Sequence, residues 1–103
     1  MIKIINGKRY NTDTATEVAK YWNGLGDGDF RHLMEELYIT SKGAWFLYGK
    51  GGAISKYAES AGNQSWGSST IIPLTDDEAY EWCERHNKAD VIEEYFSDKV
   101  EEA

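Results

Sequence analysis

The pattern of apolar and polar residues predicts a β-hairpin at the start of the chain, then a helix, then several strands and finally two helices. The β-branched residues of segment 2–5 precede Asn6-Gly7, the two-residue sequence most typical of a tight turn. Residues 8–10 can return as the second strand, so the chain is predicted to begin with a β-hairpin.

A helix is predicted over residues 13–22, with Thr12 or Asp13 as its N-cap. The spacing of its apolar residues would place them on one helical face: Ala15, Val18, Ala19 and Trp22. The glycine-rich segment 23–29 ends this helix, because glycine is costly in a helix interior.

The middle of the chain predicts a sheet. Phe30–Thr40 and Ala44–Gly49 flank a three-residue link that ends in glycine, which is typical of a hairpin with a bulge. The apolar run 45–48 suits a central strand, and Ser69–Leu74 is predicted as another. Two alternatives stay open: residues 32–37 also fit a helical period, and residues 54–63 suit a short helical turn or an irregular loop.

The C-terminal quarter predicts two helices. Thr75 and Glu78 form a capping box at the start of the first helix, which continues to about His86. Asp90 is a candidate cap for a second, shorter helix. We therefore expect a single α+β domain over residues 1–103. It would hold a small antiparallel sheet with an N-terminal hairpin, one helix after the hairpin, and two acidic C-terminal helices.

The distribution of charge along the chain says more about function than the overall composition does. The formal net charge is −7, and residues 74–103 alone carry eleven acidic and three basic residues. Residues 1–73 carry seven acidic and eight basic residues, so the negative charge belongs to the predicted C-terminal helices. Such a surface repels nucleic acid and attracts basic grooves. We expect a protein partner with a basic nucleic-acid-binding groove and no direct binding of nucleic acid.

The sequence also limits location and chemistry. It has one cysteine, Cys83, which excludes an intrachain disulfide and fits a reducing cytoplasm. No apolar run is long enough for a membrane span, and residues 1–7 lack the apolar core of a signal peptide. We expect a cytoplasmic protein that makes no contact with a membrane.

Several catalytic and metal-binding interpretations fail on spacing. The segment 27–29 begins like a calcium loop, but Arg31 and His32 then stand where that motif needs a ligand and a glycine. Residues 49–52 lack the spacer of a phosphate-binding loop and suit a mobile connection or a close backbone crossing. His32, Cys83 and His86 could supply part of a zinc or nucleophile site, and Cys83 and His86 are three apart on one helix, yet no fourth ligand and no second cysteine lies near them in sequence. We expect no metal, no cofactor and no catalytic residue.

Tryptophans offer one further candidate. Packing in the core accounts for Trp22, Trp45 and Trp82, whereas Trp66 lies in a polar loop and is a candidate contact hot spot. The acidic candidates for partner binding are Asp76, Asp77, Glu78, Glu81, Glu84, Asp90, Glu93 and Glu94. Enhanced solubility is the alternative explanation for these acids.

Three segments resemble a family of small proteins from phages and mobile elements that is associated with type I anti-CRISPR proteins. They are residues 5–15 (INGKRYNTDTA), 45–53 (WFLYGKGGA) and 71–79 (IIPLTDDEA), the last followed by Trp82. The resemblance covers nearly the whole chain. It implies a non-enzymatic inhibitor that acts in the bacterial host and binds an RNA-guided surveillance complex, and it carries no residue-level motif.

Charge suggests how such an inhibitor would act. Carboxylates three and four residues apart on a helix lie about 5–6 Å from one another, and such a row can imitate the phosphates of DNA. The expected mechanism is therefore a block of target DNA binding by mimicry. The same electrostatics fit an antitoxin or immunity protein that binds a basic toxin or nuclease, and a third possibility is a small hydrolase that uses Cys83 and His86.

Overall fold

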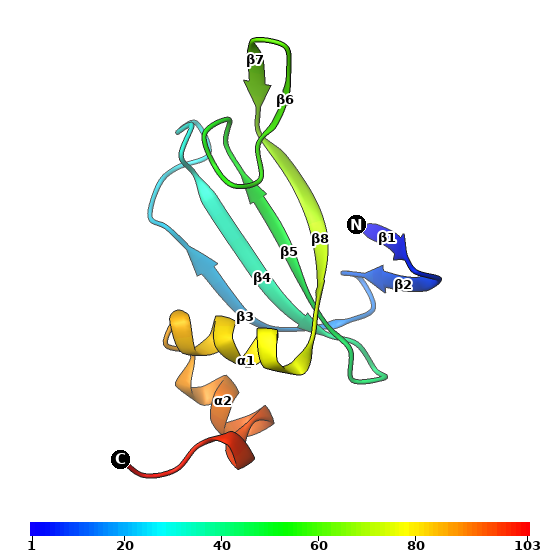
Figure 1. Cartoon of the computed structure of the whole chain (residues 1–103), viewed down its shortest axis with the longest axis vertical. Coiled ribbons are helices and arrows are strands. Elements are labelled where there is room, and N and C mark those ends of the chain that lie inside the picture. The colour runs from blue at the N-terminus through cyan, green and yellow to red at the C-terminus, as the bar shows by residue number, and fades with distance from the viewer.

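The computed structural model describes the whole chain, residues 1–103, and places a four-stranded antiparallel sheet at its centre (Figure 1). The strand order is β3-β4-β5-β8. Two separate hairpins and a C-terminal pair of helices complete the predicted α+β fold. The elements in chain order are β1 (Ile2–Ile5), β2 (Lys8–Asn11), β3 (Thr16–Trp22), β4 (Leu33–Ile39), β5 (Trp45–Gly51), β6 (Glu59–Ala61), β7 (Gln64–Trp66), β8 (Ser68–Leu74), α1 (Asp76–Arg85), α2 (Ala89–Tyr95) and a 3₁₀ turn (Ser97–Lys99).

The predicted N-terminal hairpin is confirmed as β1 and β2. Asn6 and Gly7 both have positive φ angles, of 52° and 77°, which is the backbone that a tight two-residue hairpin turn requires. The hairpin packs through Tyr10, which meets the ring of Phe46 edge-on at 5.5 Å. Tyr10 therefore joins the hairpin to the face of the sheet that carries Tyr38 and Phe46.

The central hairpin is also confirmed. β4 pairs with β5 in a continuous register that includes Leu37 opposite Leu47. This pairing decides between the two alternatives for residues 32–37 in favour of a strand, because a helix there would leave β5 without its partner strand. β8 then pairs along the other edge of β5, so β5 lies between two strands and its apolar run is buried. Pro73 lies in β8, an edge strand, which is where proline is tolerated in a sheet.

The helix predicted over residues 13–22 is wrong, because residues 16–22 form strand β3 paired with β4 and residues 13–15 lie in the turn before it. A β-bulge between Glu17 and Ala19 shifts the register there. Val18 and Ala19 are adjacent in sequence, and both pack against the larger apolar cluster, which includes residues of α1. Two adjacent inward-facing residues at a bulge resemble the apolar spacing of a helix. Trp22 is not part of the core as predicted, because its side chain lies at the outer end of the edge strand and remains 55% exposed.

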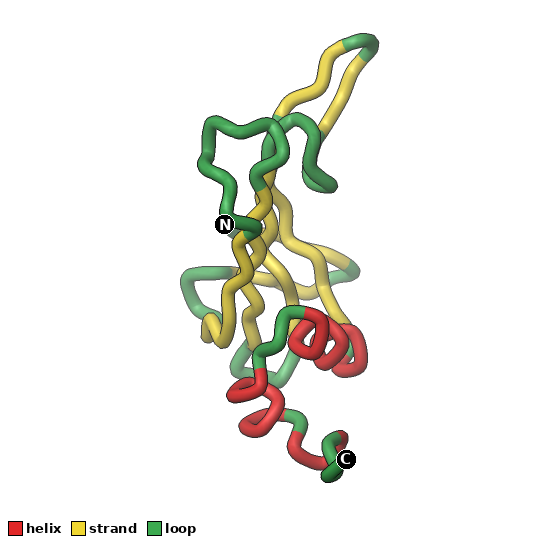
Figure 2. Tube along the Cα trace, turned by 90° about the vertical axis from the view of Figure 1, so that its left-hand side faces the viewer, coloured by secondary structure: helices red, strands yellow, loops and turns green.

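Residues 54–63, for which a short helical turn and an irregular loop were both open, form neither along their whole length. A loop leads into a short hairpin of β6 and β7, in which Glu59 pairs with Trp66. Gly62 has a positive φ of 60° at the tip of this hairpin. The hairpin projects from the end of the sheet that lies farthest from the helices (Figure 2). The prediction that Trp66 lies in a loop is wrong, because Trp66 is the last residue of strand β7, and its side chain is 44% exposed.

Both predicted C-terminal helices are present, and they gather at one end of the sheet (Figures 1 and 2). Asp90 is not the cap of the second helix: α2 begins at Ala89, Lys88 precedes it without a side-chain cap, and Asp90 lies in the first turn. Asn87, with a positive φ of 54°, lies in the turn between the two helices. No helix is long and apolar enough to cross a membrane.

The core has two parts, one on each face of the sheet. The larger part lies between the sheet and the helices and comprises Leu37, Trp45, Leu47, Ala79, Trp82, Cys83 and Phe96. The smaller part lies on the other face, where the N-terminal hairpin contributes Tyr10 and the sheet contributes Tyr38, Phe46 and Ile71. This division explains why residues 45–48 are apolar without alternation, since both faces of β5 are covered.

Candidate functional site

The first turn of α1 is fixed by a capping box. The Thr75 hydroxyl accepts a hydrogen bond from the Glu78 amide at 3.1 Å, and a carboxylate oxygen of Glu78 accepts one from the Thr75 amide at 2.8 Å. The carboxylates of Asp76 and Asp77 also lie in this turn, where the helix dipole favours negative charge. The local sequence thus holds the start of the acidic segment in one geometry.

The acidic candidates form an exposed set, here called the acidic surface. It comprises Asp76, Asp77, Glu78, Glu81 and Glu84 on α1 and Asp90, Glu93 and Glu94 on α2, and each of these residues is exposed. Asp77, Glu81 and Glu84 are four and three residues apart, which places them along one stripe of α1. α1 and α2 pack against each other, so the acids of both helices belong to the same end of the molecule.

Few positive groups neutralise this surface. The ammonium of Lys99 lies 3.0 Å from Asp77, and the hydroxyl of Tyr80 donates a hydrogen bond to Glu84 at 2.8 Å. No ion pair within 4.0 Å involves the remaining acidic residues of the set. The end of the molecule that carries the helices therefore presents unpaired carboxylates to solvent.

Trp66 does not belong to the acidic surface. It lies in β7, at the end of the molecule opposite the helices (Figure 1). The acidic surface and Trp66 therefore cannot form one continuous contact patch. Trp66 instead lines a cavity at its own end of the sheet, together with residues from the loop before β4.

Sequence reasoning missed a buried carboxylate on the helix-facing side of the sheet. Glu35 in β4 is 1% exposed, and it accepts hydrogen bonds from Trp82 Nε1 at 3.0 Å and from the hydroxyl of Tyr57. The ammonium of Lys56 lies 2.7 Å from the same carboxylate, and His86 Nε2 lies 3.9 Å away. The period-two alternation of Leu33, Glu35 and Leu37 was the available signal, because it places Glu35 on the inward face.

The hydrogen bonds determine the charge state of this carboxylate. Burial by itself raises the pKa of Glu35, but the bonds from Lys56, Tyr57 and Trp82 together hold the pKa below its usual value. Burial is also the main cause that lowers the pKa of His86, whose ring stacks on Tyr21 with centroids 3.9 Å apart. The ionised carboxylate of Glu35 is bonded to Lys56, Tyr57 and Trp82, and the bond from Trp82 holds α1 against the sheet. We interpret this group of residues as structural.

Cys83 and His86 do not form a reactive pair on the surface. Cys83 is fully buried in the larger core, and burial raises the pKa of its thiol to about 11. The thiol therefore stays protonated near neutral pH, whereas nucleophilic cysteines need a thiolate. His86 faces Glu35 and Tyr21, and its contacts are those of a packed aromatic residue.

The two loop motifs rejected on spacing have structural roles. Asp29 accepts a hydrogen bond from the Arg31 amide at 2.8 Å, which stabilises a turn. Gly52 lies against the backbone of Asp29 and Phe30, so closely that a Cβ atom would collide with both carbonyl oxygens. This is the predicted close backbone crossing. No group of three or more metal-binding side chains is present.

The fold and its surfaces define a small α+β protein with a strongly acidic helical end. The chain matches no protein-family model, and no curated protein and no solved structure is significantly similar to it.

Proposed function

We propose that this protein is an inhibitor whose acidic surface occupies a basic, nucleic-acid-binding groove on a protein partner. The observation that carries the proposal is the set of exposed and mostly unpaired carboxylates on α1 and α2. Concentrating so much like charge at one end of a small domain costs stability. A basic partner would offset this repulsion, because each carboxylate would gain an opposite charge on binding.

The stripe of Asp77, Glu81 and Glu84 supports mimicry of a nucleic-acid backbone. Its neighbouring carboxylates are carried by Cβ atoms about 5–6 Å apart on a rigid helix. Lysine and arginine side chains that contact successive phosphates would meet these carboxylates over a similar distance. Occupation of the groove would then exclude DNA by direct competition.

The resemblance to type I anti-CRISPR proteins suggests the particular partner. A type I surveillance complex binds its target DNA in basic grooves, and it operates in the cytoplasm of the bacterial host. We therefore propose that this protein binds such a complex and blocks target recognition. A basic toxin or nuclease is the alternative partner, since its substrate-binding groove has the same electrostatic character.

A mobility-shift assay tests the proposal. Purified type I surveillance complex is mixed with target DNA, with and without the protein, at low and high salt. We expect DNA binding to be lost at low salt and partly restored at high salt, because salt screens contacts between exposed charges. Unchanged DNA binding at both salt concentrations would exclude a block of target recognition in that system.

A pair of charge-reversed variants localises the contact. Glu81→Lys combined with Glu84→Lys reverses two members of the α1 stripe, and inhibition should be lost. Glu59→Lys is the matched control, because Glu59 is exposed in β6 at the opposite end of the molecule. Full inhibition by the Glu81/Glu84 double variant would show that the acidic surface is not the contact site. Capture of a basic nuclease or toxin by the wild-type chain alone would favour the alternative partner.

A further inference from the structure

A cavity of about 550 Å³ lies between the N-terminal hairpin and the turn that joins β4 to β5, and its volume is within the range of small-molecule sites. One wall is β2, which pairs only with β1 and therefore has one unpaired edge. The other walls come from the turn before β3 and the turn between β4 and β5. Its basic side chains and its aliphatic hydroxyls are those of Lys8, Arg9, Thr14, Thr40, Ser41 and Lys42.

Three basic side chains line this cavity, and no acidic side chain does. Lys8, Arg9 and Lys42 are all exposed, and none of them forms an ion pair within 4.0 Å. The chain as a whole has eighteen acidic and eleven basic residues, so the composition of this cavity is opposite to that of the chain. The positive potential of the three cations is uncompensated, and it attracts an anion.

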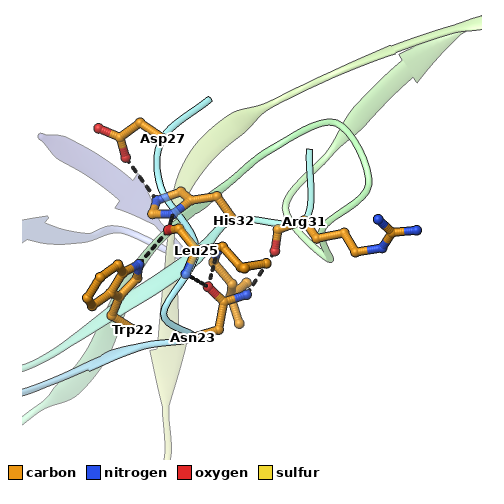
Figure 3. Close-up of polar contacts among 7 residues, drawn as sticks. Trp22, Asn23, Leu25, Asp27, Arg31 and His32 are labelled. Atoms are coloured by element: carbon orange, nitrogen blue, oxygen red, sulfur yellow. Dashed lines mark hydrogen bonds and ion pairs between the residues drawn. The ribbon is translucent and has the colours of Figure 1, made fainter. Parts of the chain in front are cut away.

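The cavity at the opposite end of the sheet has a different character. Asp27 and Asp29 line it beside Lys50, so charges of both signs are present. The buried ring of His32 is already engaged there, because its nitrogens lie 3.2 Å from the Asp27 carboxylate and 2.7 Å from the Leu25 carbonyl oxygen (Figure 3). Of these two cavities, the one beside β2 alone selects for one sign of charge.

Neutral donors accompany the cations, and the backbone around them is held in place. The Thr40 hydroxyl accepts a hydrogen bond from the Ala44 amide at 3.0 Å, so its own hydrogen remains available to a ligand. The Thr40 amide donates to the Ala44 carbonyl at 2.8 Å, which fixes the turn. On the other side of the cavity, the Asn11 carbonyl accepts hydrogen bonds from the Thr14 and Ala15 amides. Preorganisation of this kind reduces the ordering cost of binding.

A phosphate group matches this set of donors better than a carboxylate does. A carboxylate carries one negative charge and two oxygens, whereas a phosphate monoester carries about −1.5 to −2 charges at neutral pH and three acceptor oxygens. The planar guanidinium of Arg9 can donate two parallel hydrogen bonds to such a group. Lys8 and Arg9 are neighbours in an extended strand, so their side chains leave β2 on opposite sides and flank its unpaired edge.

The charge around the cavity favours a compact ligand over a polymer. Ala44 lines the cavity, and the next residue, Trp45, pairs with Leu74 at the end of β8. The acidic first turn of α1 follows directly and begins at Asp76. A nucleic acid that passed over the cavity would bring its remaining phosphates toward these carboxylates, which would repel them. A small ligand places its whole negative charge among the cations.

We propose that this cavity binds a small molecule that carries a phosphate monoester, with the phosphate held by Arg9, Lys8 and Lys42 and by the Thr40 hydroxyl. The site shares no residue with the acidic surface, and it does not rest on the function proposed for that surface. The three basic side chains are exposed and lie outside both parts of the core, so each can be replaced without disturbing it.

Titrations followed by ¹H–¹⁵N NMR test this inference, at constant ionic strength and about pH 7.5, where phosphate monoesters are mostly dianions. The probes are inorganic phosphate, ribose 5-phosphate and adenosine monophosphate, each added up to about 20 mM, a range that saturates sites of millimolar Kd. We expect saturable shifts of the Arg9, Ser41 and Lys42 amides, and tighter binding of at least one ester than of inorganic phosphate.

Control titrations separate the phosphate group from other sources of binding. Succinate, which is also a dianion, and adenosine, which lacks the phosphate, should give no saturable shifts. Equal affinity for succinate and the esters would overturn the assignment to phosphate, and so would the absence of saturable shifts with all three phosphate probes. Binding of inorganic phosphate alone would show that the cavity does not recognise the rest of a small molecule. A single-stranded oligothymidylate that bound more tightly than either ester would identify a nucleic-acid site and overturn the proposal.

Variants then assign the contacts. Arg9→Gln should weaken ester binding about tenfold or more, because a hydrogen bond to a charged group is worth about one decade in Kd. Arg9→Lys should retain part of the affinity, since it keeps the charge and loses the paired donors. Lys42→Gln should weaken binding as well. Arg31→Gln is the matched control, because Arg31 is exposed in the loop before β4 and does not line the cavity. Unchanged affinity of both Arg9→Gln and Lys42→Gln would refute the assignment.

Discussion

Trp82 in α1 donates a hydrogen bond from its indole Nε1 to the buried carboxylate of Glu35 in β4, over 3.0 Å and across 47 residues of sequence. This contact fastens the acidic helical end to the sheet. Tyr57 and Lys56, from the loop between β5 and β6, complete the same carboxylate shell. The position of the acidic surface therefore depends on one charged group inside the core.

Removal of the Glu35 carboxylate should be strongly destabilising. In Glu35→Ala, the buried donors of Tyr57 and Trp82 lose their acceptor, at a cost of about 1–3 kcal/mol each, whereas the half-exposed ammonium of Lys56 can turn to solvent. Glu35→Gln keeps the shape and should cost less, about 1–3 kcal/mol. Urea unfolding measures both, with exposed Glu59→Gln as control. A Glu35→Ala variant as stable as wild type would contradict the structural role of the cluster.

The free energy of unfolding should fall in two stages as the pH is lowered. The folded-state pKa values of His86 and Glu35 are both lowered, so the unfolded chain binds more protons and stability rises with pH in each window. Acidification should first destabilise the protein below about pH 6.5, where unfolded His86 protonates, and again below about pH 4.3, where unfolded Glu35 protonates.

Thermal unfolding between pH 3 and pH 8 gives the profile. His86→Phe keeps an aromatic ring against Tyr21 and should remove the first stage alone, whereas Glu35→Gln should remove the second. A first stage that persists unchanged in His86→Phe would assign it to another group.

Gly49→Ala should be destabilising although alanine is a small residue. Gly49 lies opposite Glu35 in the β4–β5 register, and a Cβ atom there would collide with the ring of Tyr57. The ring would have to leave its position over the strand, and its hydrogen bond to Glu35 would be lost. We expect a cost of about 1–3 kcal/mol from overpacking. Gly26→Ala, where the added atom meets nothing, serves as control in the same unfolding experiment.

Thr75→Ala should weaken α1 without touching the core. The variant loses the cap on the Glu78 amide, which is worth about 1 kcal/mol. Amide hydrogen exchange should accelerate in the first turn of α1 and stay unchanged in β4 and β5. Thr75→Ser retains the hydroxyl and should behave like wild type. Uniform acceleration across the sheet would show that the cap stabilises more than the helix end.

The thiol of Cys83 should resist modification in the folded protein. It is fully buried, and its pKa is raised to about 11, so little thiolate exists at neutral pH. A chromogenic disulfide reagent should react at the rate of unfolding in buffer and at once in denaturant. Rapid reaction in buffer would revive the possibility of a reactive cysteine.

The candidate sites were predictable only in part. Exposure of the acidic residues followed from charge alone, because carboxylates avoid burial without partners. Glu35 is the exception, and the partners that permit its burial come from a distant loop and from α1. Asp27 was considered only as part of a calcium motif, and His32 as part of that motif or of a zinc site with Cys83 and His86. The proximity of His32 to Asp27 depends on how the loop folds back on Leu25.

The sequence by itself determined the elements whose signals are local. Asn6-Gly7 specified its turn through the backbone that these residues tolerate, and Thr75 with Glu78 specified the start of α1 through hydrogen bonds three residues apart. Tertiary structure alone decided residues 16–22, where pairing with β4 and the bulge at Glu17 and Ala19 overrode an apparent helical period. It also decided that Trp66 and the acidic surface lie at opposite ends. Pairing partners and the path of the chain are non-local, so no short stretch of sequence encodes them.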